Sequence, residues 1–157
     1  MPKNKVKRTP VDADVWREIR EKEQECIAFL KLDAADAPES IVKKIDEFVD
    51  ELLESSISNE EMEKYTLMLG VMWGSMIIKK YGWEWQMLDL NDGNGSQIFL
   101  VSPKSYYCCP AIYYINNILD GGNIGPWGGN DNTIMLLFNM LANIEKKKPK
   151  SKYEVVV

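Results

Sequence analysis

The chain has 157 residues, of which 45% are hydrophobic and 27% charged, and its formal net charge is −5. This length and composition are those of one globular domain with its own hydrophobic core. The negative charge argues against nucleic acid as the main partner, because phosphate binding needs a basic face. No apolar run reaches the roughly 18–20 residues of a membrane-spanning helix, so we expect no membrane partner.

The N-terminal stretch "MPKNKVKR" is basic, and the polar residues that follow it do not form the apolar region of a signal peptide. We therefore expect a cytoplasmic protein. Three cysteines, an odd number without an export signal, fit reduced thiols. Cys108 and Cys109 are adjacent in a predicted strand, so their side chains should point to opposite faces and act as small hydrophobic groups.

Histidine is absent from the sequence. This excludes Ser-His-Asp and Cys-His catalysis, imidazole bases and zinc sites that contain histidine. Carboxylates, Lys, Tyr or a lone Cys remain as catalytic groups, and we recognise no constellation of them. We therefore expect a protein that is not an enzyme and that uses no cofactor and no metal.

The periodic part of the chain predicts a single α+β domain over residues 11–147. Residues 1–10 and 148–157 are basic and lack periodicity, so we predict a disordered N-terminal tail and a flexible C-terminal tail.

Three helices are expected before the sheet. Ser58 followed by Glu61 is a capping box for the third of them, and Gly82 is placed to end it. Gly70 and Gly74 lie four residues apart in this helix, so they share one face and allow another backbone to approach closely. The predicted ranges are 11–31, 38–55 and 58–81.

A small sheet is expected next. "WEWQMLDL" alternates in polarity, which predicts a strand that buries Trp83 and Trp85 on one face. "NDGNG" is a strong hairpin signal, and "SQIFLVS" and "YYCC" follow as strands. We expect a three-strand antiparallel meander that packs against the third and fifth helices, with the two N-terminal helices at one end. The fourth and fifth helices are "PAIYYINNIL" and "TIMLLFNMLANIEKKK".

Three ligand sites can be weighed here, and each has a simpler structural explanation. The hairpin starts like a calcium loop but has Leu100 where a bidentate Glu is needed. Tyr106 and Tyr107 with the two strand tryptophans could stack bases, yet the chain is acidic. "GGNIGPWGGN" is rich in glycine but lacks the phosphate-loop and dinucleotide fingerprints. Trp127 in this loop can equally anchor a partner or cover the sheet.

The segments "LGVMWGSMIIKKYGWEWQMLDL", "IFLVSPKSYYCCPAIYYINNIL" and "DNTIMLLFNML" together resemble a family of small, largely uncharacterised bacterial α+β domains. The resemblance covers Leu69 to Leu141 and consists of packing motifs. Similar small acidic domains are immunity proteins of polymorphic toxins. The resemblance therefore implies a toxin as the protein partner and supplies no catalytic residue.

We accordingly expect a non-catalytic protein-binding module, most concretely an immunity protein that occludes a basic toxin domain through electrostatic complementarity. The alternative is a small-molecule binder or a weak enzyme in the cleft between sheet and helices, with Glu84 and Tyr106 or Tyr107 as acid–base groups. The expected partner-binding residues are Glu84, Asp89, Asp92, Trp127 and Asp131.

Overall fold

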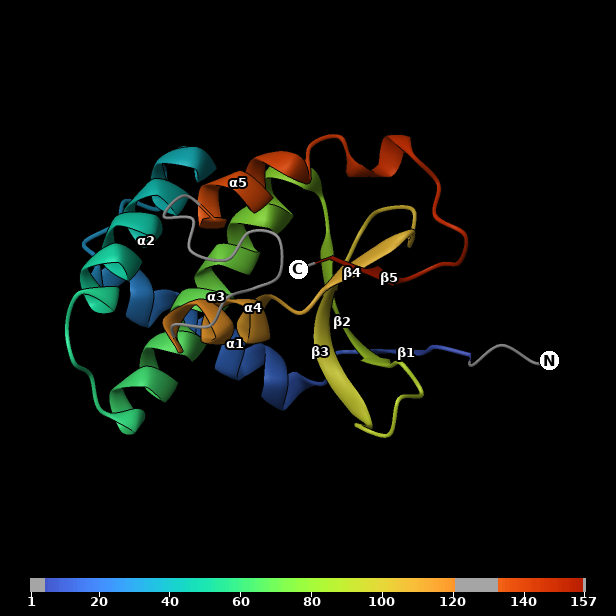
Figure 1. Cartoon of the computed structure of the whole chain (residues 1–157), viewed down its shortest axis with the longest axis horizontal. Coiled ribbons are helices and arrows are strands. Elements are labelled where there is room, and N and C mark those ends of the chain that lie inside the picture. The colour runs from blue at the N-terminus through green and yellow to red at the C-terminus, as the bar shows by residue number, and fades with distance from the viewer. Residues whose placement is uncertain (1–4, 121–132, 157) are drawn as a thin grey trace.

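A computed structural model describes residues 5–120 and 133–156, and it has an α+β fold in which a helical layer packs beside and against a twisted sheet (Figure 1). The elements in chain order are β1 Lys7–Pro10, α1 Ala13–Phe29, α2 Pro38–Leu53, α3 Asn59–Tyr81, β2 Glu84–Asp89, β3 Ser96–Val101, β4 Tyr107–Cys109, α4 Ala111–Leu119, α5 Thr133–Met140, a 3-10 helix Ile144–Lys146 and β5 Glu154–Val155.

The sheet has five strands in the order β1-β2-β3-β4-β5. β1 to β4 pair antiparallel and β5 joins β4 in parallel, so the sheet is mixed. The hairpin predicted from "NDGNG" is confirmed, since β2 pairs with β3 from Glu84↔Val101 to Asp89↔Ser96. The predicted three-strand sheet is wrong in its strand count, because both ends of the described chain add a strand.

The two predicted tails are the source of these additional strands. Lys7–Pro10 pairs with β2, and Glu154–Val155 pairs with β4. Every residue of these two strands is exposed. Hydrophobic alternation arises when one face of a strand is buried, so exposed edge strands that are held through backbone hydrogen bonds leave little trace in the sequence.

The helix ends follow from local chemistry. α3 begins with the predicted capping box, in which Ser58 Oγ accepts from Glu61 N–H and the Glu61 carboxylate accepts from Ser58 N–H. It ends at Gly82, whose φ of 76° is in the left-handed region that glycine adopts without a steric penalty. Asp12 caps α1 by accepting from Val15 N–H at 2.9 Å.

α3 is the central helix, and its two glycines explain how closely its neighbours approach. A Cβ placed on Gly70 would lie 2.8 Å from Ile112 Cα in α4, and one placed on Gly74 would lie 2.5 Å from Trp85 Cη2 in β2. Both distances are shorter than real carbon–carbon contacts. The glycine pair therefore serves internal packing in this chain, against α4 and against the sheet.

Aromatic contacts join the other helices to α3. Phe29 of α1, Phe48 of α2 and Tyr65 of α3 form a three-ring cluster with centroid distances of 5.3–5.7 Å. Trp73 stacks on Tyr114 of α4 at 5.0 Å. Such pairs add to the burial of apolar area by roughly 0.5–1.5 kcal/mol each.

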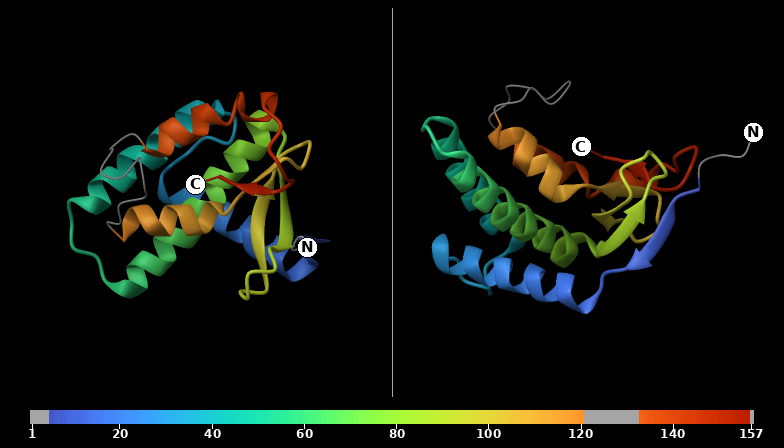
Figure 2. Two further views of the ribbon diagram at one scale, coloured as in Figure 1. Left: turned by 45° about the vertical axis from the view of Figure 1, so that its right-hand side comes forward. Right: turned by 90° about the horizontal axis from the view of Figure 1, so that it is seen from below.

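The position of the first helix differs from the expectation. α1 runs alongside α3 over much of its length and leads directly out of β1, instead of sitting with α2 at one end of the domain (Figure 2). The strand β1 is the reason, because it places the start of α1 next to β2. No helix in the described ranges is both long and apolar enough to span a bilayer.

The sheet buries side chains on both faces, whereas one buried face was expected. Trp83 and Trp85 belong to the main core, as predicted. Leu88, Phe99, Val101 and Cys108 form a second buried cluster, which Val6, Leu90 and Tyr153 cover. Cys109 lies in the main core, so the prediction that the two adjacent cysteines face opposite sides is confirmed.

We predict that Gly74→Ala lowers the free energy of unfolding by about 1–3 kcal/mol, because the new methyl group overlaps the Trp85 indole. Helix propensity alone would raise it by about 1 kcal/mol, so the sign of the effect identifies the steric cause. Urea denaturation measures the change, with the exposed Lys64→Ala of the same helix as the control. The cost of Gly74→Ala should shrink in the background Trp85→Leu, and a stabilised single variant would contradict the prediction.

We predict that a chain ending at Lys152 is less stable by about 2–3 kcal/mol. The truncation removes three backbone hydrogen bonds, from Tyr153, Glu154 and Val156 to Ser105, Tyr106 and Cys108 carbonyls, each of which contributes about 1 kcal/mol. It also uncovers the second buried cluster. Thermal unfolding tests this, with Glu154→Ala as the control that keeps the backbone. An unchanged midpoint would show that β5 does not stabilise the sheet.

Candidate functional site

A groove of about 830 Å³ lies beside the β2–β3 hairpin, where α1 and α4 meet the sheet. Its wall is mostly apolar, and Tyr113 of α4 stands at it with 59% of its surface exposed. An apolar concave surface with few polar groups is the usual form of a binding site. The groove is lined by Val15, Met87, Leu90, Asp92, Asn94, Ser96, Gln97, Ile98, Phe99, Pro110, Ile112, Tyr113 and Val155.

An unpaired strand edge forms part of this groove. β3 pairs with β2 along its whole length, but with β4 only at Leu100 and Val101. Ser102 donates its N–H to Tyr107 O at 3.0 Å, on the β4 side. Backbone groups of a strand alternate between its two edges, so those of Ile98 and Ser96 point to this same side. In the described part of the chain no strand pairs with them there.

The charge of the groove is negative. Asp92 is the one ionisable side chain with a formal charge among its described lining residues. The Asp92 carboxylate also accepts from Asn94 N–H at 3.0 Å, and Asp89 accepts from Asn91 N–H at 2.8 Å. The two carboxylates therefore hold the turn of the hairpin, which is a structural role in addition to any contact with a partner.

The predicted partner-binding residues are only partly brought together. Asp92 lines the groove, and Asp89 lies at the end of β2, on the opposite face of the strand from Glu84 and at its other end. Trp127 and Asp131, with the glycine-rich loop and the predicted cap of α5, lie outside the described residues. Among the three described residues, Glu84 and Asp89 therefore lie apart on β2, and the partner-binding surface of all five residues stays a prediction.

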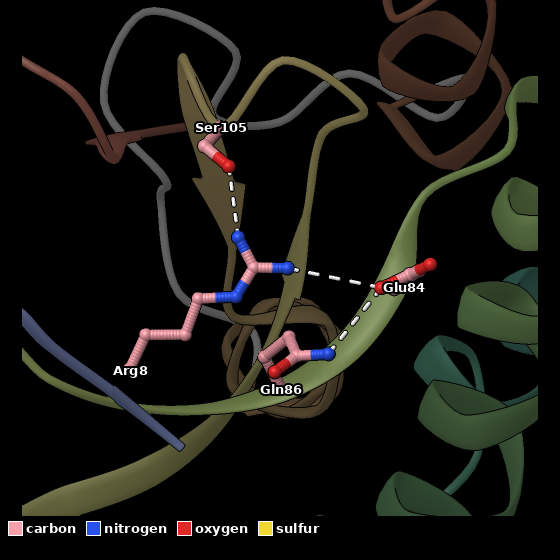
Figure 3. Close-up of polar contacts among 4 residues, drawn as sticks. All are labelled: Arg8, Glu84, Gln86 and Ser105. Carbon is pink, nitrogen blue, oxygen red and sulfur yellow. Dashed lines mark hydrogen bonds and ion pairs between the residues drawn. The ribbon is translucent and has the colours of Figure 1, made fainter. Parts of the chain in front are cut away.

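Glu84 belongs to a polar cluster on the second face of the sheet (Figure 3). Its Oε2 lies 3.7 Å from Arg8 Nη2 and accepts from Gln86 Nε2 at 3.4 Å. Arg8 Nη1 donates to Ser105 Oγ at 2.8 Å. Because Arg8 comes from β1 and Ser105 precedes β4, the cluster ties the edge strand across the sheet.

Of the two tyrosines in the alternative prediction, Tyr107 lies away from Glu84, and the pairing of Glu84 with Tyr106 stays a prediction. Glu84 shares a face with Val101 and Cys108 through the strand register, so the adjacent Tyr107 points to the opposite face. The Tyr107 hydroxyl donates to Lys147 O at 2.7 Å, and burial raises its pKa. Trp83, Trp85 and Tyr107 are all buried, so they offer no platform on which bases can stack.

The three cysteines are buried, free thiols. Burial raises the pKa of Cys26 and of Cys108 to about 12, and it also raises the pKa of Cys109. A thiol reacts through its thiolate, so these three groups are poor nucleophiles at neutral pH. Within the described ranges, no group of three or more Cys, Asp or Glu side chains is arranged to hold a metal ion.

Comparison of the chain with protein-family models, with curated proteins and with solved structures finds no match. The resemblance to immunity proteins of polymorphic toxins therefore stays a prediction.

Sequence reasoning predicted a cleft between sheet and helices, but of the residues that line this groove it named only Asp92 as a binding residue. The wall is built from four separate segments, and their meeting is a property of the tertiary fold. One signal was present in the tandem Tyr113-Tyr114: a short helix buries one of two adjacent residues, and here Tyr114 is 1% exposed and Tyr113 59%. A large aromatic side chain on the outer face of a short helix is a recognisable sign of a contact surface.

We predict that the native protein reacts slowly with a disulfide reagent such as 5,5′-dithiobis(2-nitrobenzoate) at pH 8, and that three thiols react at once in urea. The folded pKa of Cys26 is raised from 9.0 to about 12. The contribution of this thiol to stability is therefore complete below pH 9 and is lost as pH rises towards 12. Fast reaction of one thiol in the native state would contradict the buried geometry.

Proposed function

We propose that this protein is a non-catalytic protein-binding module, and specifically an immunity protein that occludes a toxin. The observation that carries the proposal is the apolar groove beside the hairpin, whose wall contains the unpaired edge of β3. The sequence resemblance supplies the kind of partner, and the groove supplies the mode of binding.

The occupant is an extended segment of the toxin that adds to the free edge of β3. Backbone hydrogen bonds to Ser96 and Ile98 give such a strand its affinity, and alternate side chains enter the apolar groove. Proteins protect strand edges that must not pair by keeping them short, charged or covered. β1 is protected in this way, because it is short and carries Lys7, Arg8 and Pro10. The edge at Ser96–Phe99 carries no charged side chain.

The charge of the partner segment follows from the charge of this surface. Asp92 lines the groove without a basic neighbour among the described lining residues, and the whole chain carries −5. Complementary charge speeds the encounter and selects the partner more than it raises affinity. The segment is therefore basic at the hairpin end, and Tyr113 anchors it at the other.

The test is co-expression with the protein encoded by the neighbouring gene, followed by co-purification and a growth assay. If the neighbour is toxic alone, Tyr113→Ala should weaken the complex at least about tenfold, since exposed aromatic anchors contribute most of the binding energy. The control Glu47→Ala, exposed on α2, should leave binding unchanged. A harmless neighbour with no complex would contradict the proposed function.

Two substitutions of Ile98 test whether the partner adds a strand to β3. Ile98→Ala removes the side chain and keeps the N–H, whereas Ile98→Pro also removes the N–H that points to the free edge. Proline is accepted in a strand where its missing N–H faces an unpaired edge. We expect Ile98→Pro to bind at least about fivefold more weakly than Ile98→Ala at similar thermal stability. Equal affinity of the two variants would refute strand addition and leave the groove as a side-chain surface.

A further inference from the structure

A second cavity, of about 310 Å³, lies between α1 and α3 and shares no lining residue with the groove. The two helices run side by side here (Figure 2). The cavity is lined along facing stripes at helical spacing, and its volume is near the lower limit for ligand sites, so it suits a small molecule. The facing stripes are Trp16, Ile19, Arg20, Glu23 and Ile27 on α1 and Met72, Ser75, Met76 and Lys79 on α3.

The Glu23 carboxylate gives this cavity an anionic hydrogen-bond acceptor. Glu23 is half-buried on the α3-facing side of α1, and its Oε2 accepts from Ser75 Oγ at 2.9 Å. An ionised carboxylate has about four acceptor positions. No basic group lies within ion-pair distance of Glu23 in the described part of the chain. The carboxylate therefore presents unused acceptor capacity to the cavity.

Two cationic side chains lie near this carboxylate: Arg20 is one helical turn before Glu23 on α1, and Lys79 is one turn after Ser75 on α3. Arg20 and Lys79 also line the cavity, and neither forms an ion pair with a carboxylate among the described residues. Arg20 Nε donates to Trp16 O at 3.4 Å and Lys79 Nζ donates to Ala34 O at 3.2 Å, so each is held by a backbone carbonyl. Opposite charges thus line one small cavity without neutralising each other.

The rest of the cavity wall is largely apolar. Ile19 and Met76 are 4% and 5% exposed, and the cavity also reaches Trp85 of β2 and Met72 of α3. Methionine side chains adapt their shape to an apolar group, and the Trp85 indole offers a flat wall. Within the charged run "REIREKEQE", Arg20 is exposed at the cavity, whereas Glu23 is half-buried and bonds to Ser75 of α3.

We propose that this cavity binds a free α-amino acid with a large aliphatic or aromatic side chain. Glu23 receives the ammonium group, Arg20 and Lys79 receive the carboxylate, and the side chain lies against Ile19, Met76 and Trp85. The two charged groups of an α-amino acid share one carbon and match these neighbouring side chains of opposite sign, since both groups are then paired by charge-assisted hydrogen bonds. The site is independent of the partner groove and of the proposed function.

The test is isothermal titration calorimetry of the full chain with L-phenylalanine and L-leucine. Three analogues each lack one recognition element: 3-phenylpropanoate lacks the ammonium group, phenethylamine lacks the carboxylate and glycine lacks the side chain. We expect binding of at least one of the two amino acids, with every analogue weaker by about tenfold or more. This titration alone would overturn the proposal if neither amino acid gave a heat of binding, or if an analogue bound as tightly as the amino acids.

The variants assign the two charges. Glu23→Gln should weaken L-phenylalanine about tenfold and abolish the discrimination against 3-phenylpropanoate, because the ammonium partner is gone. The double variant Arg20→Gln and Lys79→Gln should also weaken L-phenylalanine about tenfold. It should abolish the discrimination against phenethylamine, because the partners of the carboxylate are gone. Glu21→Gln, exposed on the same helix outside the cavity, is the control and should change nothing. Unchanged affinity and selectivity in Glu23→Gln, with the fold verified by circular dichroism, would also overturn the proposal.

Discussion

The contact between Gly74 and the Trp85 indole sets the geometry on which the rest of the molecule depends. It brings the sheet against the central helix with no side chain between them on the helix side. Residues on the same face of β2 then line both candidate sites. Trp85 closes the cavity between α1 and α3, and Met87, two residues further along, lines the groove beside the hairpin. Glycine costs helix propensity at position 74, and the fold recovers that cost as tight packing.

The features that sequence reasoning predicted are those whose cause is local. The capping box at Ser58, the left-handed cap at Gly82 and the opposite faces of Cys108 and Cys109 each depend on a few neighbouring residues, and all are present. The strands β1 and β5 depend on partners far along the chain and bury little side-chain surface, so no periodic signal marks them. The groove and the cavity arise where separate elements meet, which periodicity cannot describe.

The two candidate sites use different physical chemistry, and this keeps them separable. The groove offers backbone groups at a strand edge and recognises shape and chain direction. The cavity offers the carboxylate of Glu23 with the cations Arg20 and Lys79 nearby, and we propose that it recognises a zwitterion. The groove lies where α1 and α4 meet the hairpin, and the cavity lies between α1 and α3 with Trp85 of β2 in its wall. The net negative charge of the chain favours a basic partner at the groove. The cavity contains side chains of both charges, so the net charge matters less for its ligand.

The sheet is edged by the two ends of the described chain, and this determines the order in which the molecule can assemble during synthesis. β1 leaves the ribosome early but has no partner until β2 has emerged, after three helices. β5 follows every other element of the described chain, so β4 has no parallel neighbour until residues 154–155 have been synthesised. The helices α1 to α3, joined by local aromatic contacts, can collapse first, whereas closure of both sheet edges has high contact order and comes last. Until β5 pairs with β4, the cluster around Cys108 lacks the part of its cover that Tyr153 provides, and uncovered apolar surface of this kind is what chaperones bind.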